Sequence, residues 1–274
     1  LKECLRSISE QDYPKELVEV LVVTEGTPES AKAIGLKRST GEIVCFMASD
    51  CEFLSRDIFQ EVNYCLNQHI TGVYSKVYEY VKTDPILNRY FSLFGCNDPI
   101  SLYLGKCDRL PYYANLHFPN REVSFFCKSI PTLGDNGFFV WRKLIMNTDL
   151  EHYSHIDNCE DMRKNGDYIY VRTFMPIHHK TGDSLWLWIK KRFHYAESLN
   201  QNRRWKMLGD FSDYLKLVFF CFIALSLIEP FIRALWGYCK SGIRDKAWFL
   251  HPIICFITVF VYGALCLKFL LLYV

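Results

Sequence analysis

The stretch "GEIVCFMASDCEF", Gly41 to Phe53, combines an apolar strand pattern with clustered acids. It begins at a turn glycine, continues through five apolar residues at 43–47, and ends on Asp50 and Glu52. Such a short apolar run is typical of a strand covered on both faces. Ligands of open α/β sheets bind at the carboxyl ends of strands. Two carboxylates there predict a divalent cation such as Mg²⁺ or Mn²⁺, and a loop acid that caps the next helix is the alternative.

Helical and strand patterns alternate around this stretch. The order predicts an α/β layered sheet with right-handed crossovers, the Rossmann-like class. The expected elements are a helix at 1–10, a strand at 17–23, a helical or loop connection at 30–40, a strand at 42–47, a helix at 54–68 with Ser55 as its N-cap, a strand at 71–81 and a strand at 167–179.

Composition excludes several classes of function. The 274 residues allow one large domain with an appendage, and a net charge of +2 without a recognition motif predicts no nucleic-acid partner. The twelve cysteines contain no CxxC pair. They indicate reduced thiols used as small apolar residues rather than a Cys/His zinc site.

The composition changes near residue 213. Two apolar stretches follow, 214–238 and 247–274, each about long enough to cross a bilayer. The first contains Glu229, Pro230 and Arg233, so we expect it to kink, end early or lie partly at the interface. Residues 186–212 are aromatic and basic, which suits lipid headgroups. Two buried helices of a soluble protein are the alternative.

A dense set of matches links the chain to a known family. Up to about residue 205 the sequence resembles the family 2 glycosyltransferases. The matching positions are Cys4-Leu5, Ser7, Gln11, Tyr13-Pro14, Glu19, Gly41-Glu42 and Asp50-Cys51, with further likeness in "GDNGFFVWRK", "NCEDMRKNGDYIYV" and "QNRRW". The resemblance implies a glycosyltransferase A fold, an inverting mechanism, a nucleotide-diphospho-sugar donor and a divalent metal, Mn²⁺ or Mg²⁺.

The resemblance also implies donor-side residues, with departures from the family pattern. The family's Asp-x-Asp metal motif is Ala48-Ser49-Asp50 here, so Asp50 is the expected metal ligand. Glu52 and His178 are expected as further ligands, with His179 beside them. Thr24-Glu25 stands where the family has an acid, which makes Glu25 the nearest donor contact. Lys32 and Arg204 complete the expected donor side. The family's first strand is absent, so one strand position of the sheet is expected to be empty.

The stretch "CEDM" resembles the family's motif for the catalytic base. The resemblance assigns the base to Asp161, supported by Glu160, with Asp157 in reserve. An inverting transfer needs one carboxylate to take the proton of the acceptor hydroxyl. The alternative is that these acids only favour the start of a helix.

Two stretches are assigned to the acceptor. In "TLGDNGFFVWRK", Asp135 and Asn136 are expected to hydrogen-bond acceptor hydroxyls, and a tight turn on two glycines is the alternative. "QNRRW" resembles the QxxRW motif, so Gln201 and Trp205 are expected at the acceptor, with the Trp ring stacking on a sugar. A basic, aromatic belt beside the membrane is the alternative. Asp98, Asp108 and Arg109 are further candidates for lining the cleft.

These observations predict a membrane-anchored transferase. The expected parts are a catalytic domain at 1–185, an amphipathic segment at 186–212 and two membrane helices at 213–274. The predicted reaction moves a sugar from a nucleotide-diphosphate donor to a lipid-linked or cell-surface glycan. We expect a multi-pass protein in contact with membrane lipids, with the catalytic domain in the cytoplasm. The alternatives are a polyprenyl-phosphate glycosyltransferase and a non-catalytic glycan-binding or scaffold relative.

Overall fold

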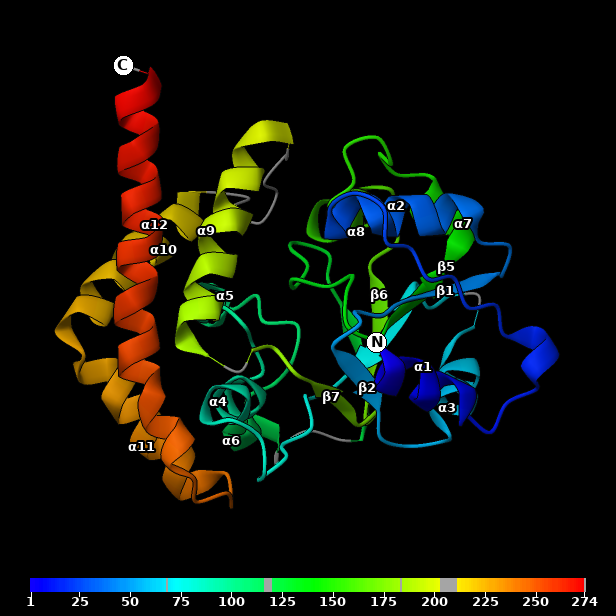
Figure 1. Cartoon of the computed structure of the whole chain (residues 1–274), viewed down its shortest axis with the longest axis horizontal. Helices are drawn as coiled ribbons and strands as arrows, with labels where there is room; N and C mark the ends of the chain where they lie inside the picture. The colour runs from blue at the N-terminus through cyan, green and yellow to red at the C-terminus, as the bar shows by residue number, and fades with distance from the viewer. Residues whose placement is uncertain (68, 116–119, 183, 203–210, 274) are drawn as a thin grey trace. The chain divides into compact units, whose positions relative to one another are not determined.

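The chain is a mixed α/β protein that divides into two compact units (Figure 1). The computed structural model describes residues 1–67, 69–115, 120–182, 184–202 and 211–273. Unit 1 is formed by Leu1–Glu79 and Phe118–His179, and unit 2 by Tyr80–His117 and Lys180–Val274. Residues 80–115, which the sequence places in the catalytic domain, therefore pack with the C-terminal helices.

A five-stranded mixed sheet forms the centre of unit 1. Its order is β1 (Ile43–Phe46), β5 (Phe138–Trp141), β3 (Gly72–Ser75), β6 (Ile169–Thr173) and β4 (Arg121–Phe125). Only β3 and β6 run parallel to each other, and the remaining pairs are antiparallel. A second sheet pairs β2 (Cys51–Phe53) with β7 (Ile177–His179) in antiparallel register. The α/β class is confirmed, with a sheet of mixed direction.

Helices cover both faces of the five-stranded sheet. On one side lie α2 (Pro28–Arg38), α7 (Arg142–Met146) and α8 (His155–Lys164), and on the other α1 (Lys2–Ser9) and α3 (Ile58–Cys65) (Figure 1). The alternation of side chains along β5 supplies both cores. Phe138 and Val140 pack beneath α2, α7 and α8, whereas Phe139 packs toward α3. This layering positions the loops at the strand ends, where the candidate site lies.

The predicted strand at 17–23 does not form. Lys15–Leu17 is a short 3-10 helix, and residues 18–23 run without ladder pairing to any described strand. Val20 and Val22 are about half exposed, at 48% and 51%. The apolar pattern predicted a buried strand, but a strand needs a neighbour whose N–H and C=O groups complete its ladder.

Two further predictions of local structure need correction. Helix α3 begins at Ile58 with Asp57 at its N-cap, and Ser55 donates its hydroxyl to the Asp57 carboxylate instead of capping the helix. The predicted strand at 167–179 is split into β6 and β7 around Pro176, a residue that lacks the N–H a ladder requires.

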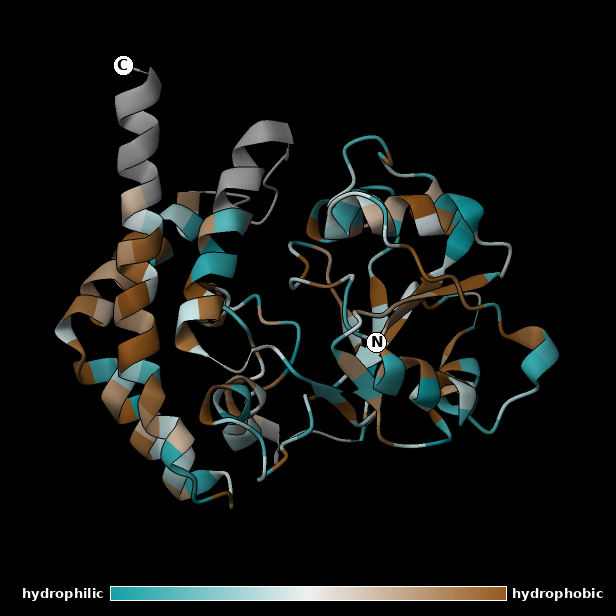
Figure 2. Cartoon of the chain, viewed as in Figure 1, coloured by the Kyte–Doolittle hydropathy of each residue, from teal (hydrophilic) through white to brown (hydrophobic). Residues whose placement is uncertain are grey.

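Unit 2 is helical. It contains α4 (Ile86–Phe94), α5 (Pro99–Leu104), α6 (Tyr112–Asn115), α9 (Leu185–Asn202), α10 (Phe211–Ser226), α11 (Ile228–Lys240), a 3-10 turn at Lys246–Leu250 and α12 (His251–Tyr273). Figure 2 shows that the described parts of α10, α11 and α12 are predominantly hydrophobic. Buried Trp188 and Trp248 join α11 and α12 to α4 in one core, and α10 packs with α5 and α12 in another.

One helical segment, Lys246–Ala264, is long and apolar enough to cross a membrane. The first stretch that the sequence predicts as a span is bent: α10 and α11 meet at 82°. The break falls at Leu227, whose φ is +59°, directly before Glu229 and Pro230. Among the described helices, α10 and α11 together therefore form at most one broken or re-entrant span.

Strand β5, which lies between β1 and β3 in the interior of the sheet, should contribute strongly to the stability of unit 1. Phe138 is fully buried, so Phe138→Ala removes a packed ring and should destabilise the fold by about 3–5 kcal/mol. Phe125 on the edge strand β4 is 64% exposed, and Phe125→Ala should change stability by less than about 0.5 kcal/mol. Urea unfolding of both variants measures the difference. Equal losses would contradict the burial of β5 in the interior of the sheet.

Candidate functional site

The loop "GDNG", 134–137, brings the polar side chains of unit 1 together. Its backbone is left-handed at three positions, with φ of +106° at Gly134, +53° at Asn136 and +79° at Gly137. A Cβ at Gly134 would lie 2.8 Å from the Cβ of His155, and one at Gly137 would lie 2.4 Å from the Ile177 side chain. Gly134 is therefore required by conformation and by space, whereas Gly137 is required by its conformation, because the end of the Ile177 side chain could move aside. The tight turn expected as an alternative is present.

Three different metal-ligand types meet on one side of this loop. We call Asp50, Cys51 and His179 the Asp-Cys-His cluster; one ligand atom from each lies within 4.8 Å of the others. Asp50 precedes β2, and Cys51 at the start of β2 is the register partner of His179 at the end of β7. His179 Nε2 lies 3.7 Å and Cys51 Sγ lies 4.0 Å from Asp50 Oδ1.

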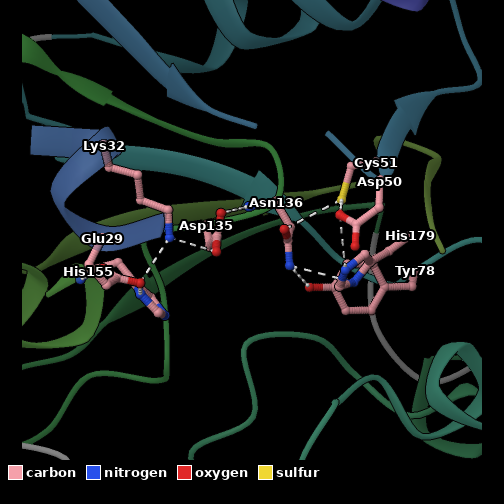
Figure 3. Close-up of polar contacts among 9 residues, drawn as sticks. All are labelled: Glu29, Lys32, Asp50, Cys51, Tyr78, Asp135, Asn136, His155 and His179. Atoms are coloured by element: carbon pink, nitrogen blue, oxygen red, sulfur yellow. Dashed lines mark hydrogen bonds and ion pairs between the residues drawn. The ribbon is translucent and has the colours of Figure 1, made fainter. Parts of the chain in front are cut away.

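Asn136 connects this cluster to the loop (Figure 3). Its Oδ1 accepts from Cys51 Sγ at 3.4 Å, and its Nδ2 lies 3.1 Å from the Tyr78 hydroxyl and 3.5 Å from His179 Nδ1. The Tyr78 and His179 rings also pack, with centroids 5.1 Å apart. Cys51, Asn136 and His179 are buried, whereas Asp50 is about one-third exposed. A ligand could therefore reach the cluster from the Asp50 side.

The cluster fits a divalent cation, with a donor set that differs from the expected one. The sequence predicts an all-oxygen site completed by one histidine. The cluster instead offers one carboxylate oxygen, one sulfur and one imidazole nitrogen. Borderline-soft cations prefer sulfur and nitrogen, whereas Mg²⁺ prefers oxygen. Asp50 is common to both sets.

The predicted ligands Glu52 and His178 lie on the opposite face of the β2–β7 pair. Neighbouring residues of a strand alternate between faces, and Glu52 is the register partner of His178. Glu52 Oε1 lies 2.8 Å from His178 Nδ1; His178 is buried and Glu52 is half-buried. Burial raises the pKa of the nearby Glu79 carboxyl, and His178 opposes that shift. The structure therefore brings His179, not His178, to Asp50.

A second polar cluster lies on the other side of the loop (Figure 3). Lys32 Nζ lies 2.7 Å from Asp135 Oδ2 and 3.1 Å from Glu29 Oε1, and His155 Nδ1 lies 2.8 Å from the same Glu29 oxygen. We call these four residues the Lys32 cluster. Thr27 caps the N-terminus of α2, and Glu29 and Lys32 lie three residues apart on the same face of that helix. The structure thus brings together Lys32 and Asp135, which the sequence assigned to donor and acceptor.

Charge pairing controls protonation in the Lys32 cluster. Burial disfavours the charge of Lys32, but Asp135 and Glu29 outweigh burial, so the pKa of Lys32 lies above its ordinary value. Burial also opposes ionisation of Glu29, yet attraction from His155 and Lys32 holds its pKa well below the ordinary value. The pKa of Asp135 is lowered in the same way, mainly by Lys32 against burial. The three groups are therefore charged at neutral pH.

The candidates for the catalytic base lie on α8. Asp161 is half-buried in the second turn, and Asp157 is buried in the first. Glu160 forms an ion pair with Arg163 at 2.6 Å. The start of this helix contacts the Lys32 cluster through His155. These acids therefore belong to unit 1, on the element that meets Gly134.

The remaining candidates lie elsewhere. Glu25 forms a surface ion pair with Arg38 at 3.2 Å, with both side chains more than half exposed. Arg204 and Trp205 lie outside the described residues, and Gln201 lies in the last turn of α9. Asp98, Asp108 and Arg109 belong to unit 2, where Asp98 contacts Arg192 and Tyr262, and Arg109 pairs with Asp108.

Sequence reasoning missed three residues of the two clusters, and it also missed Tyr78, which contacts Asn136 and His179. Cys51 was taken as a family match and a small apolar residue, and Tyr78, Glu29 and His155 were given no role. The spacing of Cys51 and His179 becomes informative only when 51–53 and 177–179 are known to pair, because directly opposed residues share a face. The "PESAK" start of α2 does place Glu29 and Lys32 at helical spacing, a signal that was available.

Comparison of the chain with protein-family models and with curated protein sequences finds no match. The candidate site is therefore described by its own geometry.

Acid should weaken unit 1 through the Lys32 cluster. Because the folded-state pKa of Glu29 lies below its ordinary value of about 4.5, its stabilisation is present above that pH and lost as pH falls through the folded value. Glu29→Gln should remove this dependence and cost about 3 kcal/mol at neutral pH, since Lys32 and Asp135 keep only part of the network. Urea unfolding between neutral and acid pH measures both effects.

Glu16→Gln is the matched control, because Glu16 is exposed in the short helix before residue 18. It should leave both the stability and its pH dependence unchanged. An acid dependence retained in full by Glu29→Gln would contradict this assignment.

Proposed function

We propose that the protein is an inverting glycosyltransferase that uses a nucleotide-diphospho-sugar and a divalent metal. The observation that carries the proposal is the meeting of Asp50 with His179 and Cys51 at the end of β1, where the family resemblance expects the metal. Three potential ligands from two strands, with Asp50 partly exposed, suit a cation that must also reach a substrate phosphate. Sugar transfer from a diphosphate donor needs such a charge beside the leaving group.

Each residue has a separate role in this proposal. Asp50 and His179 would hold the metal, which supplies positive charge to the departing diphosphate. Lys32 would keep Asp135 ionised and fixed, because the two lie 2.7 Å apart. A fixed carboxylate can accept hydrogen bonds from sugar hydroxyls of the acceptor. Asp161 would take the proton of the attacking hydroxyl.

The acceptor in this proposal is lipid-linked or a cell-surface glycan. Support comes from the apolar segment Lys246–Ala264 and from the exposed apolar residues of α10 and α11, such as Phe219, Phe222 and Phe231. These features support an acceptor that is held at a membrane surface. A multi-pass arrangement with a cytoplasmic catalytic unit is part of the proposal, as are Arg204 and Trp205 at the diphosphate and acceptor.

One observation favours a second candidate, a non-catalytic glycan-binding relative. Glu25, the nearest substitute for the family's donor-side acid, pairs with Arg38 at the surface, and residues 18–23 before it lie outside the sheet. A donor pocket without that acid would bind the nucleotide weakly. Glycan binding without release of nucleoside diphosphate from any donor would support this candidate.

Release of nucleoside diphosphate from a panel of nucleotide-sugars tests the proposal. The full chain in detergent, with membrane acceptors and each of Mn²⁺, Mg²⁺ and Zn²⁺ in turn, should release one nucleoside diphosphate with at least one of these cations, and EDTA should abolish release. Asp161→Asn should lower the rate by about 10²–10⁴-fold, the usual contribution of a general base. Asp50→Ala should raise the metal concentration needed for half-maximal rate. Asp57→Asn, at the N-cap of α3, is the matched control and should retain activity.

Full activity of Asp161→Asn would remove the base from the mechanism and favour an acceptor that is already ionised, such as a lipid phosphate. No release from any donor by the folded protein would contradict the proposed function.

A further inference from the structure

We infer that the Asp-Cys-His cluster is a centre for a thiophilic divalent cation of the Zn²⁺ class, with Cys51 as a thiolate ligand and Asn136 as the residue that orients Cys51 and His179. The inference shares only its location with the proposed function, because cation binding needs no sugar transfer.

The spacing of the three ligand atoms supports this choice. Tetrahedral zinc holds sulfur at about 2.3 Å and nitrogen or oxygen at about 2.0–2.2 Å, which sets neighbouring ligand atoms about 3.3–3.8 Å apart. The separations of 3.7 Å between Asp50 and His179 and 4.0 Å between Asp50 and Cys51 lie close to that range. Octahedral Mg²⁺ needs neighbouring oxygens about 3 Å apart. The cluster is therefore nearer to the tetrahedral arrangement.

The chemistry of the ligand atoms also favours a cation of the Zn²⁺ class. Cys51 is buried, and its Sγ lies within 4.8 Å of the ligand atoms of Asp50 and His179, so a cation bound by those two residues would lie near sulfur. Thiolate and imidazole select Zn²⁺ over Mg²⁺. Three protein ligands with one partly exposed side leave a fourth position for water or a substrate oxygen, the pattern of open zinc sites.

Asn136 can orient Cys51 and His179 both in the metal-free centre and in the metal-bound centre. In the structure its Oδ1 accepts from the Cys51 thiol, while its Nδ2 donates toward Tyr78 and His179 Nδ1. A half-turn of the amide exchanges its two ends. Oδ1 then accepts from the Tyr78 hydroxyl and from His179 Nδ1–H, and Nδ2 donates to a Cys51 thiolate. With these hydrogen bonds the proton of His179 is on Nδ1, so Nε2 can bind the cation. Zinc-binding histidines commonly donate their other ring N–H to an outer-shell partner in this way.

The binding step balances with one proton released. The S–H bond of Cys51 breaks, its proton goes to solvent, and a sulfur–metal bond forms. The His179 proton moves from Nε2 to Nδ1 through solvent, so the imidazole stays neutral. Binding should therefore weaken as the pH falls and should release about one proton per cation.

Co²⁺ binding to the full chain in detergent tests the inference, because Co²⁺ reports its ligands by absorption. The wild type should give a thiolate-to-Co²⁺ charge-transfer band with strong visible bands of tetrahedral Co²⁺. Equimolar Zn²⁺ should displace it, and a large excess of Mg²⁺ should not. Cys51→Ser should abolish the charge-transfer band, whereas the matched control Cys45→Ser, at an exposed position on β1, should keep it.

Two further variants keep the test decisive where Cys51→Ser does not fold. Asn136→Ala should weaken Co²⁺ binding by about 10–100-fold, the usual cost of losing an outer-shell partner. Asp50→Asn should weaken it while keeping the charge-transfer band at saturation. A band of equal strength in Cys51→Ser and Cys45→Ser, or displacement of Co²⁺ by Mg²⁺ as readily as by Zn²⁺, would overturn the inference. An intact band in a protein that transfers no sugar would overturn only the proposed function.

Discussion

The left-handed backbone of 134–137 is the constraint on which the site depends. On a regular strand, neighbouring side chains would point to opposite faces of the sheet. At this turn Asp135 reaches the Lys32 cluster, and Asn136, at a φ of +53°, reaches the Asp-Cys-His cluster. A left-handed Asn costs about 1 kcal/mol or more, which the contacts of its amide offset. One strained turn, directly before strand β5, therefore holds the two clusters.

The two clusters have opposite electrostatic characters. In the Lys32 cluster, the cation is already present as an ammonium between two carboxylates, and each charge fixes the ionisation of the others. In the Asp-Cys-His cluster, three potential ligand atoms lie within 4.8 Å of one another, and a cation bound among them would supply the positive charge. A diphosphate leaving group needs positive charge and an acceptor needs fixed hydrogen-bond partners. A sugar transferase requires both within one site, and this arrangement supports that proposal.

The sequence predicted features that depend on local patterns of residues. It missed features that depend on the pairing of strands far apart in the chain. Asp50 at the end of β1 and the α/β class followed from apolar periodicity. The assignment of His178 failed because face alternation becomes known only once β2 and β7 pair. Residues 17–23 were predicted as a strand from composition, although no described strand completes their ladder. The bend between α10 and α11 was expected from Glu229 and Pro230, while its 82° angle depends on packing.

The central claim is that β2, β7 and the 134–137 loop bring sulfur, nitrogen and oxygen donors to one cation. X-ray absorption at the zinc edge of the full-length, zinc-loaded protein measures this directly. The account predicts one sulfur neighbour at about 2.3 Å together with nitrogen and oxygen neighbours at about 2.0–2.2 Å. A shell of nitrogen and oxygen alone, without sulfur, would contradict it.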